Sequence, residues 1–184
     1  MYNLPTKISL EGREYEIRNK GDYRVVLDVI AALNDVNLSD GEKAVAVLII
    51  FYPQYAEISD AQTALNEVMS FINCGETDGT ETGRRSRLID FEQDFQLIVA
   101  PVNKVIGCEI RALEYLHWWT FMSAFHEVGE CSFAQVVEIR KKQAKGKKLE
   151  TWEREFYNDN KSVVDLKKRV NDKDKAIIDR VMGG

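Results

Sequence analysis

Two histidines, His117 and His126, are the side chains of this sequence best suited to bind a metal or relay a proton near neutral pH. They lie nine positions apart in one aromatic stretch, so they do not share a helical face at metal-ligand spacing. Neither an HExxH sequence nor a Cys/His array accompanies them. We therefore interpret both as packed or surface side chains, and we expect no metal ligand and no cofactor.

Three acidic residues, Asp90, Glu92 and Asp94, are the next candidates, because paired carboxylates perform acid–base chemistry. A helical turn places Asp90 and Asp94 on one face and Glu92 on another. Asp90 is also well placed to cap the helix that follows it. The sequence contains no GxSxG nucleophile motif. We predict no catalytic residues and a protein that is not an enzyme.

Three glycines, Gly75, Gly79 and Gly83, precede a pair of arginines and invite comparison with a phosphate-binding loop. Their spacing matches neither GxxxxGK[ST] nor GxGxxG, and they follow a predicted helix rather than a strand. We interpret residues 73–87 as a linker loop.

A run of basic residues extends from Arg140 to Lys148, and Trp152 follows it. Such a run could grip phosphates while the indole stacks on a base. Acidic residues follow at once and the whole chain is acidic, which favours a solvated helix face or a protein-docking arm over nucleic-acid binding. The candidate protein-interaction residues are Trp118, Trp119, Arg140, Lys141, Lys142, Lys145, Lys147, Lys148 and Trp152.

The composition indicates a globular protein with an uneven distribution of charge. The chain has 184 residues, 45% of them hydrophobic, and a net charge of −5. Residues 1–128 carry 11 basic and 20 acidic side chains, or −9, whereas residues 129–184 carry 14 and 10, or +4. This asymmetry suggests a docking arm, head-to-tail self-association or an anionic partner. Three separated cysteines, no signal-peptide pattern and no membrane-spanning window predict a reducing cytoplasm and no membrane partner.

The elements that position these residues are predicted to be mostly helical. The central element is an apolar helix within Leu113–Glu127, too short and too polar to span a bilayer. Residues 6–10 and 13–17 alternate apolar with polar around Glu11-Gly12, which predicts a β-hairpin. An isolated hairpin is marginally stable, so it must pack on the helices or pair with another chain.

The remaining helices are predicted from caps and helical spacing. Asp22 caps the first, and a Ser39–Glu42 capping box opens the second, whose nine apolar residues 44–52 could equally form a buried strand. Ser59 repeats the capping pattern before 61–72, and Ser132 is expected to cap residues 133–140. A long helix within 88–105 contains Pro101, which should kink or end it.

Together these features predict a mainly α protein: a single helical domain with a small N-terminal β-hairpin and a charged C-terminal helical arm. Residues 1–128 are expected to form the hairpin plus helical core domain. Residues 129–184 are expected to form the C-terminal helix and the basic, charged arm, packed on or extending from the core. Beyond Asn158 we expect a weakly docked helix or a frayed arm.

Three stretches carry a family resemblance. They are the hairpin followed by Asp22–Leu27, Leu33–Asp35 and Leu38–Lys43; the acidic-aromatic segment Asp90–Asp94 with Ile98; and Leu116-His-Trp-Trp-x-Phe121 followed by Val136–Arg140 and the basic run. Their order is similar to that of the bacteriophage gene-product-fifteen family, found in tailed phages and prophages of Gram-positive bacteria. The segments Pro101–Lys104 and Ile106–Cys108 depart from the family pattern, and residues beyond Asn158 match it poorly.

The resemblance implies a tail-assembly chaperone in the cytoplasm of the bacterial host. Such a protein coats the tape-measure protein, recruits the major tail (tube) protein, and is left out of the virion. One alternative is a minor structural tail component retained in the virion, and another is a small nucleic-acid-binding protein. The uneven charge adds a homo-oligomer with head-to-tail contacts as a further expectation.

Overall fold

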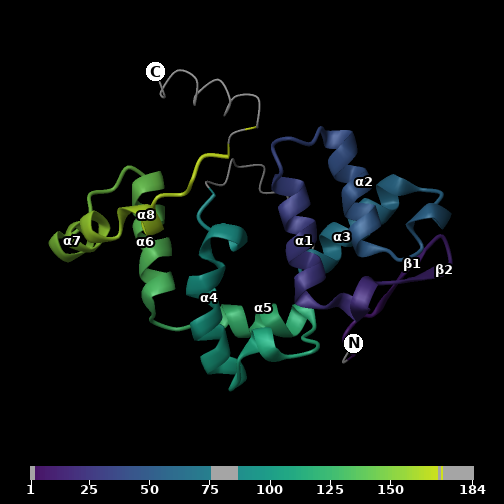
Figure 1. Ribbon diagram of the computed structural model, residues 1–184, viewed down its shortest axis with the longest axis horizontal. Helices are drawn as coiled ribbons and strands as arrows, with labels where there is room; N and C mark the ends of the chain where they lie inside the picture. Colours follow the sequence, from purple (N-terminus) through teal and green to yellow (C-terminus); the bar gives the residue numbers. More distant parts are fainter. Residues whose placement is uncertain (1–2, 76–86, 170, 172–184) are drawn as a thin grey trace. The chain divides into compact units, whose positions relative to one another are not determined.

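The computed structural model describes residues 3–75, 87–169 and 171, and it is mainly helical with an N-terminal β-hairpin (Figure 1), which confirms the predicted fold class. The chain divides into two compact units, described here one at a time: unit 1 comprises residues 1–77 with 168–184, and unit 2 comprises residues 78–167. This division differs from the expected boundary after residue 128, because α4 packs against both α5 and α6 within unit 2. Independent folding of residues 1–128 stays a prediction.

Unit 1 begins with the predicted hairpin. Strands β1 (Lys7–Leu10) and β2 (Arg13–Glu16) pair antiparallel with Ile8 opposite Tyr15. The two turn residues, Glu11 and Gly12, have φ values of 51° and 82°, as a two-residue hairpin turn with the twist of the strands requires. Ile8 and Tyr15 are buried, and β1 packs against α3. The hairpin is therefore stabilised by the helices of its own unit.

The helices of unit 1 are α1 (Tyr23–Asn34), α2 (Asp40–Phe51) and α3 (Ala61–Ile72), with 3-10 turns η1 (Arg18–Gly21) and η2 (Tyr55–Glu57). The apolar run 44–52 is thus helical, not a strand, up to its cap at Tyr52. The Tyr52 hydroxyl donates to the Ala64 carbonyl oxygen (3.2 Å), which ties the end of α2 to α3. The fully buried core side chains are Val26, Val29, Phe51, Tyr52, Ala64 and Val68.

The helix caps of unit 1 agree with the sequence in two cases of three. Asp22 accepts from the N–H of the second helical residue of α1, and Ser39 and Glu42 form the predicted capping box of α2. The cap of α3 is Asp60, not Ser59: its carboxylate accepts from two backbone N–H groups, at 3.0 and 3.1 Å. The Ser59 hydroxyl instead donates to Glu11. A carboxylate one position closer to the helix accepts better from its first N–H groups.

Unit 2 contains α4 (Phe91–Ile106), η3 (Ile110–Ala112), α5 (Trp118–His126), α6 (Ser132–Ala144), α7 (Thr151–Asp159) and α8 (Lys161–Val164). Asp90 caps α4 as predicted, whereas Cys131, not Ser132, caps α6. Helix α4 continues through Pro101 and ends at Ile106, and its C-cap residue Gly107 has a φ of 86°. Proline has no backbone N–H, so one hydrogen bond of the helix is missing at Pro101. Burial of the neighbouring side chains Ile98, Val99 and Val102 stabilises the helix despite this loss.

The aromatic stretch forms a shorter helix than its composition predicts. Helix α5 begins at Trp118 because His117 caps it: its Nδ1 accepts from the Trp119 N–H at 3.0 Å. His117 is 1% exposed, and Trp118 stacks on Phe121 with ring centroids 5.4 Å apart. Among the described residues, no helix is long and apolar enough to cross a membrane.

Candidate functional site

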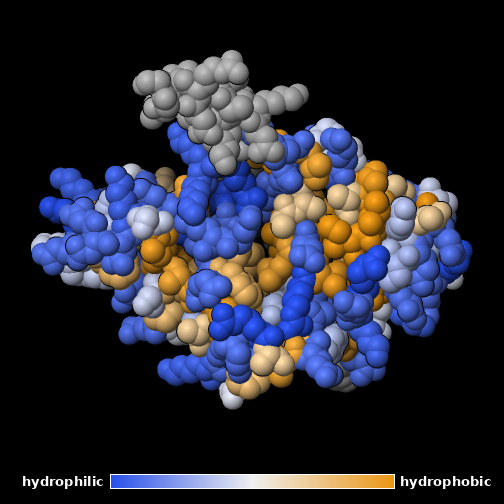
Figure 2. Space-filling model, viewed as in Figure 1, coloured by the Kyte–Doolittle hydropathy of each residue, from blue (hydrophilic) through white to orange (hydrophobic). Residues whose placement is uncertain are grey.

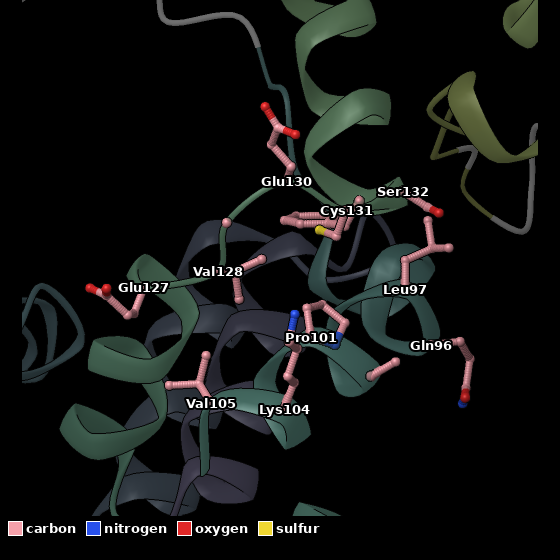
Figure 3. A pocket seen from close by; sticks show the side chains of 13 residues that line it. Gln96, Leu97, Pro101, Lys104, Val105, Glu127, Val128, Glu130, Cys131 and Ser132 are labelled. Atoms are coloured by element: carbon pink, nitrogen blue, oxygen red, sulfur yellow. The ribbon is translucent and has the colours of Figure 1, made fainter. Parts of the chain in front are cut away.

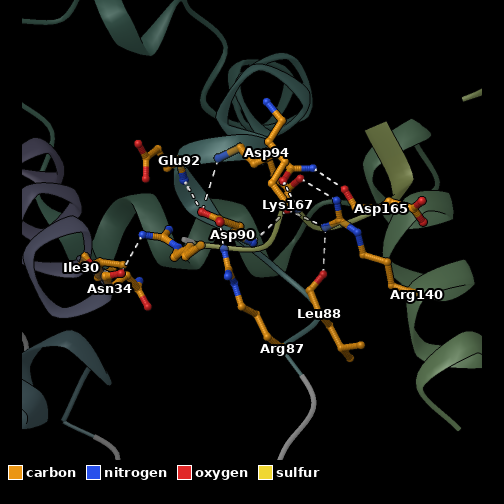
Figure 4. Close-up of polar contacts among 12 residues, drawn as sticks. Ile30, Asn34, Arg87, Leu88, Asp90, Glu92, Asp94, Arg140, Asp165 and Lys167 are labelled. Carbon is orange, nitrogen blue, oxygen red and sulfur yellow. Dashed lines mark hydrogen bonds and ion pairs between the residues drawn. The ribbon is translucent and has the colours of Figure 1, made fainter. Parts of the chain in front are cut away.

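The first residue of the basic run, Arg140, is buried and structural. Its guanidinium forms a two-point ion pair with Asp94, with Nη1 2.6 Å from Oδ2 and Nη2 2.9 Å from Oδ1 (Figure 4). It also donates to the carbonyl oxygens of Leu88, Val163 and Val164 at 2.9, 2.9 and 2.6 Å. These five hydrogen bonds use every donor that a guanidinium possesses. Arg140 therefore cannot contact a partner, although the sequence predicted that it would.

The contacts of Arg140 also fasten the chain beyond Asn158. Val164 is fully buried with Val136 and Ile139 of α6. The Gln93 side chain donates to the Asp165 carbonyl oxygen at 2.9 Å and accepts from the Lys167 N–H at 3.0 Å. Of the two alternatives expected beyond Asn158, a weakly docked helix or a frayed arm, residues 160–167 follow the first, because they include helix α8 and dock on α4 and α6. Residue 170 and residues 172–184 of the predicted arm lie outside the described part of the chain.

A second ion pair orients the turn between α6 and α7. The Lys142 ammonium lies 2.6 Å from the Glu153 carboxylate, and Glu153 is 2% exposed. The other Glu153 oxygen accepts from the Glu150 N–H at 2.8 Å, at the start of α7. The hydrogen bond from Lys142 lowers the pKa of Glu153, and the same bond raises the pKa of Lys142. The Lys142 side chain therefore links α6 to α7 through this ion pair.

Five of the predicted interaction residues remain exposed on this turn: Lys141, Lys145, Lys147, Lys148 and Trp152. We call these five residues the basic turn. The Trp152 side chain is 54% exposed, unusually high for a tryptophan. Lys141 lies 3.5 Å from Glu138, one turn earlier on α6. Lysines beside an exposed indole can attract an acidic partner and anchor it through apolar contact.

The other two tryptophans lie away from the basic turn. Trp118 is 1% exposed and packs with Phe91 and Phe121 in the core of unit 2. Trp119 is half-buried, with its ring edge-to-face against His117. Trp118 is therefore a core side chain, whereas the role of Trp119 in protein interaction stays a prediction.

The sequence analysis missed a groove in unit 2. It measures about 580 Å³ and lies between the C-terminal half of α4 and residues 127–133 (Figure 3). Leu97, Pro101, Val105, Val128 and Phe133 supply its apolar lining. One feature of the sequence could have indicated this groove: Pro101 and Val105 are apolar and share a face of α4, but they do not belong to its core face. The groove could accept apolar side chains of another protein.

The potential catalytic residues have structural partners. Asp94 pairs with Arg140 and also accepts from the Asp90 N–H at 2.9 Å. Asp90 caps α4 and pairs with Arg87. Over residues 3–75, 87–169 and 171, no group of three or more His, Cys, Asp or Glu side chains could hold a metal ion. Most of the glycine-containing loop falls on residues 76–86, outside this range.

The class of protein follows from comparison with known families. Residues 1–166, from the hairpin through α8, match a family described as Bacteriophage Gp15 protein. Comparison with curated proteins and with solved structures found no match. Because the match covers most of the chain, this protein belongs to the Bacteriophage Gp15 family. Membership indicates a phage protein with a role in the structure or assembly of the particle.

Proposed function

We propose that this protein is a non-enzymatic tail-assembly chaperone that binds the tape-measure protein and helps to recruit tail-tube subunits in the cytoplasm of the host bacterium. Besides family membership, the observation that carries the proposal is the basic turn, a short segment of the chain in which Trp152 and four lysines are all exposed. The Lys142–Glu153 ion pair presents this turn in a defined geometry.

The chemistry of the basic turn suits a reversible helper. Exposed lysines accelerate association with an acidic partner while adding little affinity, so the partner can be released. An exposed tryptophan supplies a compact apolar anchor of the kind that dominates many interfaces. We therefore expect the turn to contact acidic, amphipathic stretches of the tape-measure protein, and the α4 groove to accept its apolar side chains.

The same turn could also join copies of this protein. Residues 1–77 contain 6 basic and 12 acidic side chains, a net charge of −6. A basic turn of one copy that binds this acidic segment of the next would make a heterologous, head-to-tail contact. Such an arrangement would let several copies line up along one tape-measure chain.

The experiment is co-expression of this protein with the tape-measure protein of the same genome, followed by size-exclusion chromatography with light scattering. We expect the two to co-elute and the tape-measure protein to be soluble only when this protein is present. Lys147→Glu/Lys148→Glu with Trp152→Ala should abolish co-elution. Lys161→Glu/Lys168→Glu, with the same change in charge at exposed sites elsewhere, is the matched control and should retain it. Separate elution without rescue of solubility would contradict the chaperone proposal.

The main alternative is a minor tail component that stays in the virion. Mass spectrometry of purified particles separates the two, because a chaperone is absent from them. Nucleic-acid binding through the same lysines would instead appear as an affinity that falls steeply with salt.

A further inference from the structure

Helix α2 has a second apolar face besides its core face. Val47, Leu48 and Phe51 are buried in unit 1, whereas Val45 and Ile49 are 54% and 39% exposed. Val45 and Ile49 are four positions apart, so they lie one turn apart on one face of the helix. Figure 2 shows hydrophobic side chains gathered where Figure 1 places α2. A helix that is apolar over this much of its circumference normally packs on both sides, so the outer face fits a protein partner.

An arginine lies at the C-terminal end of this outer face. The Arg18 guanidinium donates to the carbonyl oxygens of Ile49 and Ile50, at 2.8 and 2.7 Å. The carbonyl group of a helical residue points towards the N–H four positions later, so the guanidinium lies at the level of residues 53–54. Among the residues that the structure describes, Arg18 has no carboxylate within ion-pair distance. Its positive charge therefore suits a carboxylate of another protein.

Two carboxylates lie at the N-terminal end of α2. Asp40 and Glu42 belong to its first turn and are exposed. Glu42 hydrogen-bonds to Ser39, but neither carboxylate forms an ion pair over residues 3–75, 87–169 and 171. The outer face is thus apolar at its centre, acidic at one end and basic at the other. Such a face complements a second copy of itself that runs in the opposite direction.

We propose that the outer face of α2 binds the same face of a second copy of this protein, with the two helices antiparallel and related by a two-fold axis. Val45 of each copy lies opposite Ile49 of the other. In that register Asp40 and Glu42 fall at the level of residues 52–54 of the second copy, which is where its Arg18 lies. The two-fold axis repeats every contact, so ion pairs flank the apolar centre at both ends. This inference depends neither on the chaperone proposal nor on a head-to-tail contact.

The first test is analytical ultracentrifugation of the full chain. Concentrations from about 1 μM to about 1 mM are needed, because so small a contact should be weak. We expect the dimer to increase with concentration. Val45→Asp/Ile49→Asp should raise the dissociation constant about tenfold or more, because like charges would then face each other at the apolar centre. Leu4→Asp/Met69→Asp, the same change at exposed apolar residues elsewhere in unit 1, is the matched control and should leave the constant unchanged.

A charge exchange tests the antiparallel register. Arg18→Glu by itself places a carboxylate against Asp40 and Glu42 of the second copy. Asp40→Lys/Glu42→Lys by itself places ammonium groups against Arg18. Neither chain should therefore dimerise with itself, because like charges meet at both ends of the contact. A one-to-one mixture of the two chains has opposite charges at both ends, and we expect the dimer to reappear in it.

Four results would overturn the proposal. They are a native chain that stays monomeric over this range, an unchanged dissociation constant in Val45→Asp/Ile49→Asp, a mixture of folded charge variants without dimer, and a dimer that is lost in Lys147→Glu/Lys148→Glu. The last result would show that the basic turn joins the copies instead. Circular dichroism checks that each variant keeps the native fold. If Arg18→Glu does not fold, the comparison of Val45→Asp/Ile49→Asp with its control still decides the proposal, because all four side chains are exposed.

Discussion

The ion pair between Arg140 and Asp94 should dominate the stability of unit 2. Both side chains are almost completely buried, at 4% and 1% exposure. Arg140→Met would leave the Asp94 carboxylate buried without its cation and would remove charged donors from three carbonyl oxygens. Breaking one partner of a buried pair costs about 3–5 kcal/mol in the free energy of unfolding. We expect a loss of that size for Arg140→Met.

The measurement is urea unfolding followed by tryptophan fluorescence. All three tryptophans, at 118, 119 and 152, lie in unit 2, so their emission reports the unfolding of that unit. Lys141→Met, at the exposed neighbour of Arg140 on α6, is the matched control and should change the free energy of unfolding by less than about 0.5 kcal/mol. Amide exchange should accelerate in α4, α6 and α8.

The double variant Arg140→Met/Asp94→Leu refines the prediction. It removes the buried charge as well as its partner, so it should be about 1–3 kcal/mol more stable than Arg140→Met alone. If Arg140→Met costs less than about 1 kcal/mol, or no more than Lys141→Met, then the pair does not hold α4, α6 and α8 together and the reasoning is refuted.

Three further predictions concern single residues. Gly107→Ala should destabilise unit 2 by about 1 kcal/mol in thermal unfolding, because a φ of 86° strains a residue with a side chain even though the space is open. Burial raises the pKa of Tyr52 above its ordinary value of 10.0. The buried neutral hydroxyl therefore contributes its full share of the folding free energy below pH 10, and this contribution is lost as pH rises further. Alkaline unfolding should begin at a higher pH in Tyr52→Phe. The hydrogen bond from the Arg111 side chain lowers the pKa of Glu109 to about 2. The stabilisation of the folded state by the ionised Glu109 carboxylate is therefore present above pH 4.5 and is lost as pH falls towards 2. Arg111→Met should return the Glu109 pKa towards 4.5 in an NMR titration.

Local patterns were sufficient wherever a few neighbouring residues decide the structure. The hairpin follows from two alternating segments around Glu11-Gly12, and the starts of α1, α2 and α4 follow from their caps. The predicted caps of α3 and α6 were each wrong by one position. Adjacent side chains compete for the same backbone N–H groups, and the local backbone geometry determines which of them accepts the hydrogen bond. The family resemblance was also readable from short ordered stretches and is confirmed by the match over residues 1–166.

The candidate site was only partly predictable, because sequence does not reveal which members of a charged run find buried partners. Arg140 and Lys142 belong to the same run as Lys147 and Lys148, yet the first two pair with Asp94 and Glu153. These partners are 46 and 11 positions away. The α4 groove was hidden for the same reason, since its second wall comes from residues 127–133.

The sequence by itself determined the helical class, the hairpin, most helix boundaries and the family, because periodicity, caps and turn residues act over a few positions. Only the tertiary structure decided that Trp118 and Arg140 are interior, that residues 160–167 are docked, and that the lysines of the basic turn and Trp152 are exposed. Burial and ion pairing depend on contacts between segments far apart in the chain. A one-dimensional pattern of charge and hydrophobicity does not specify such contacts.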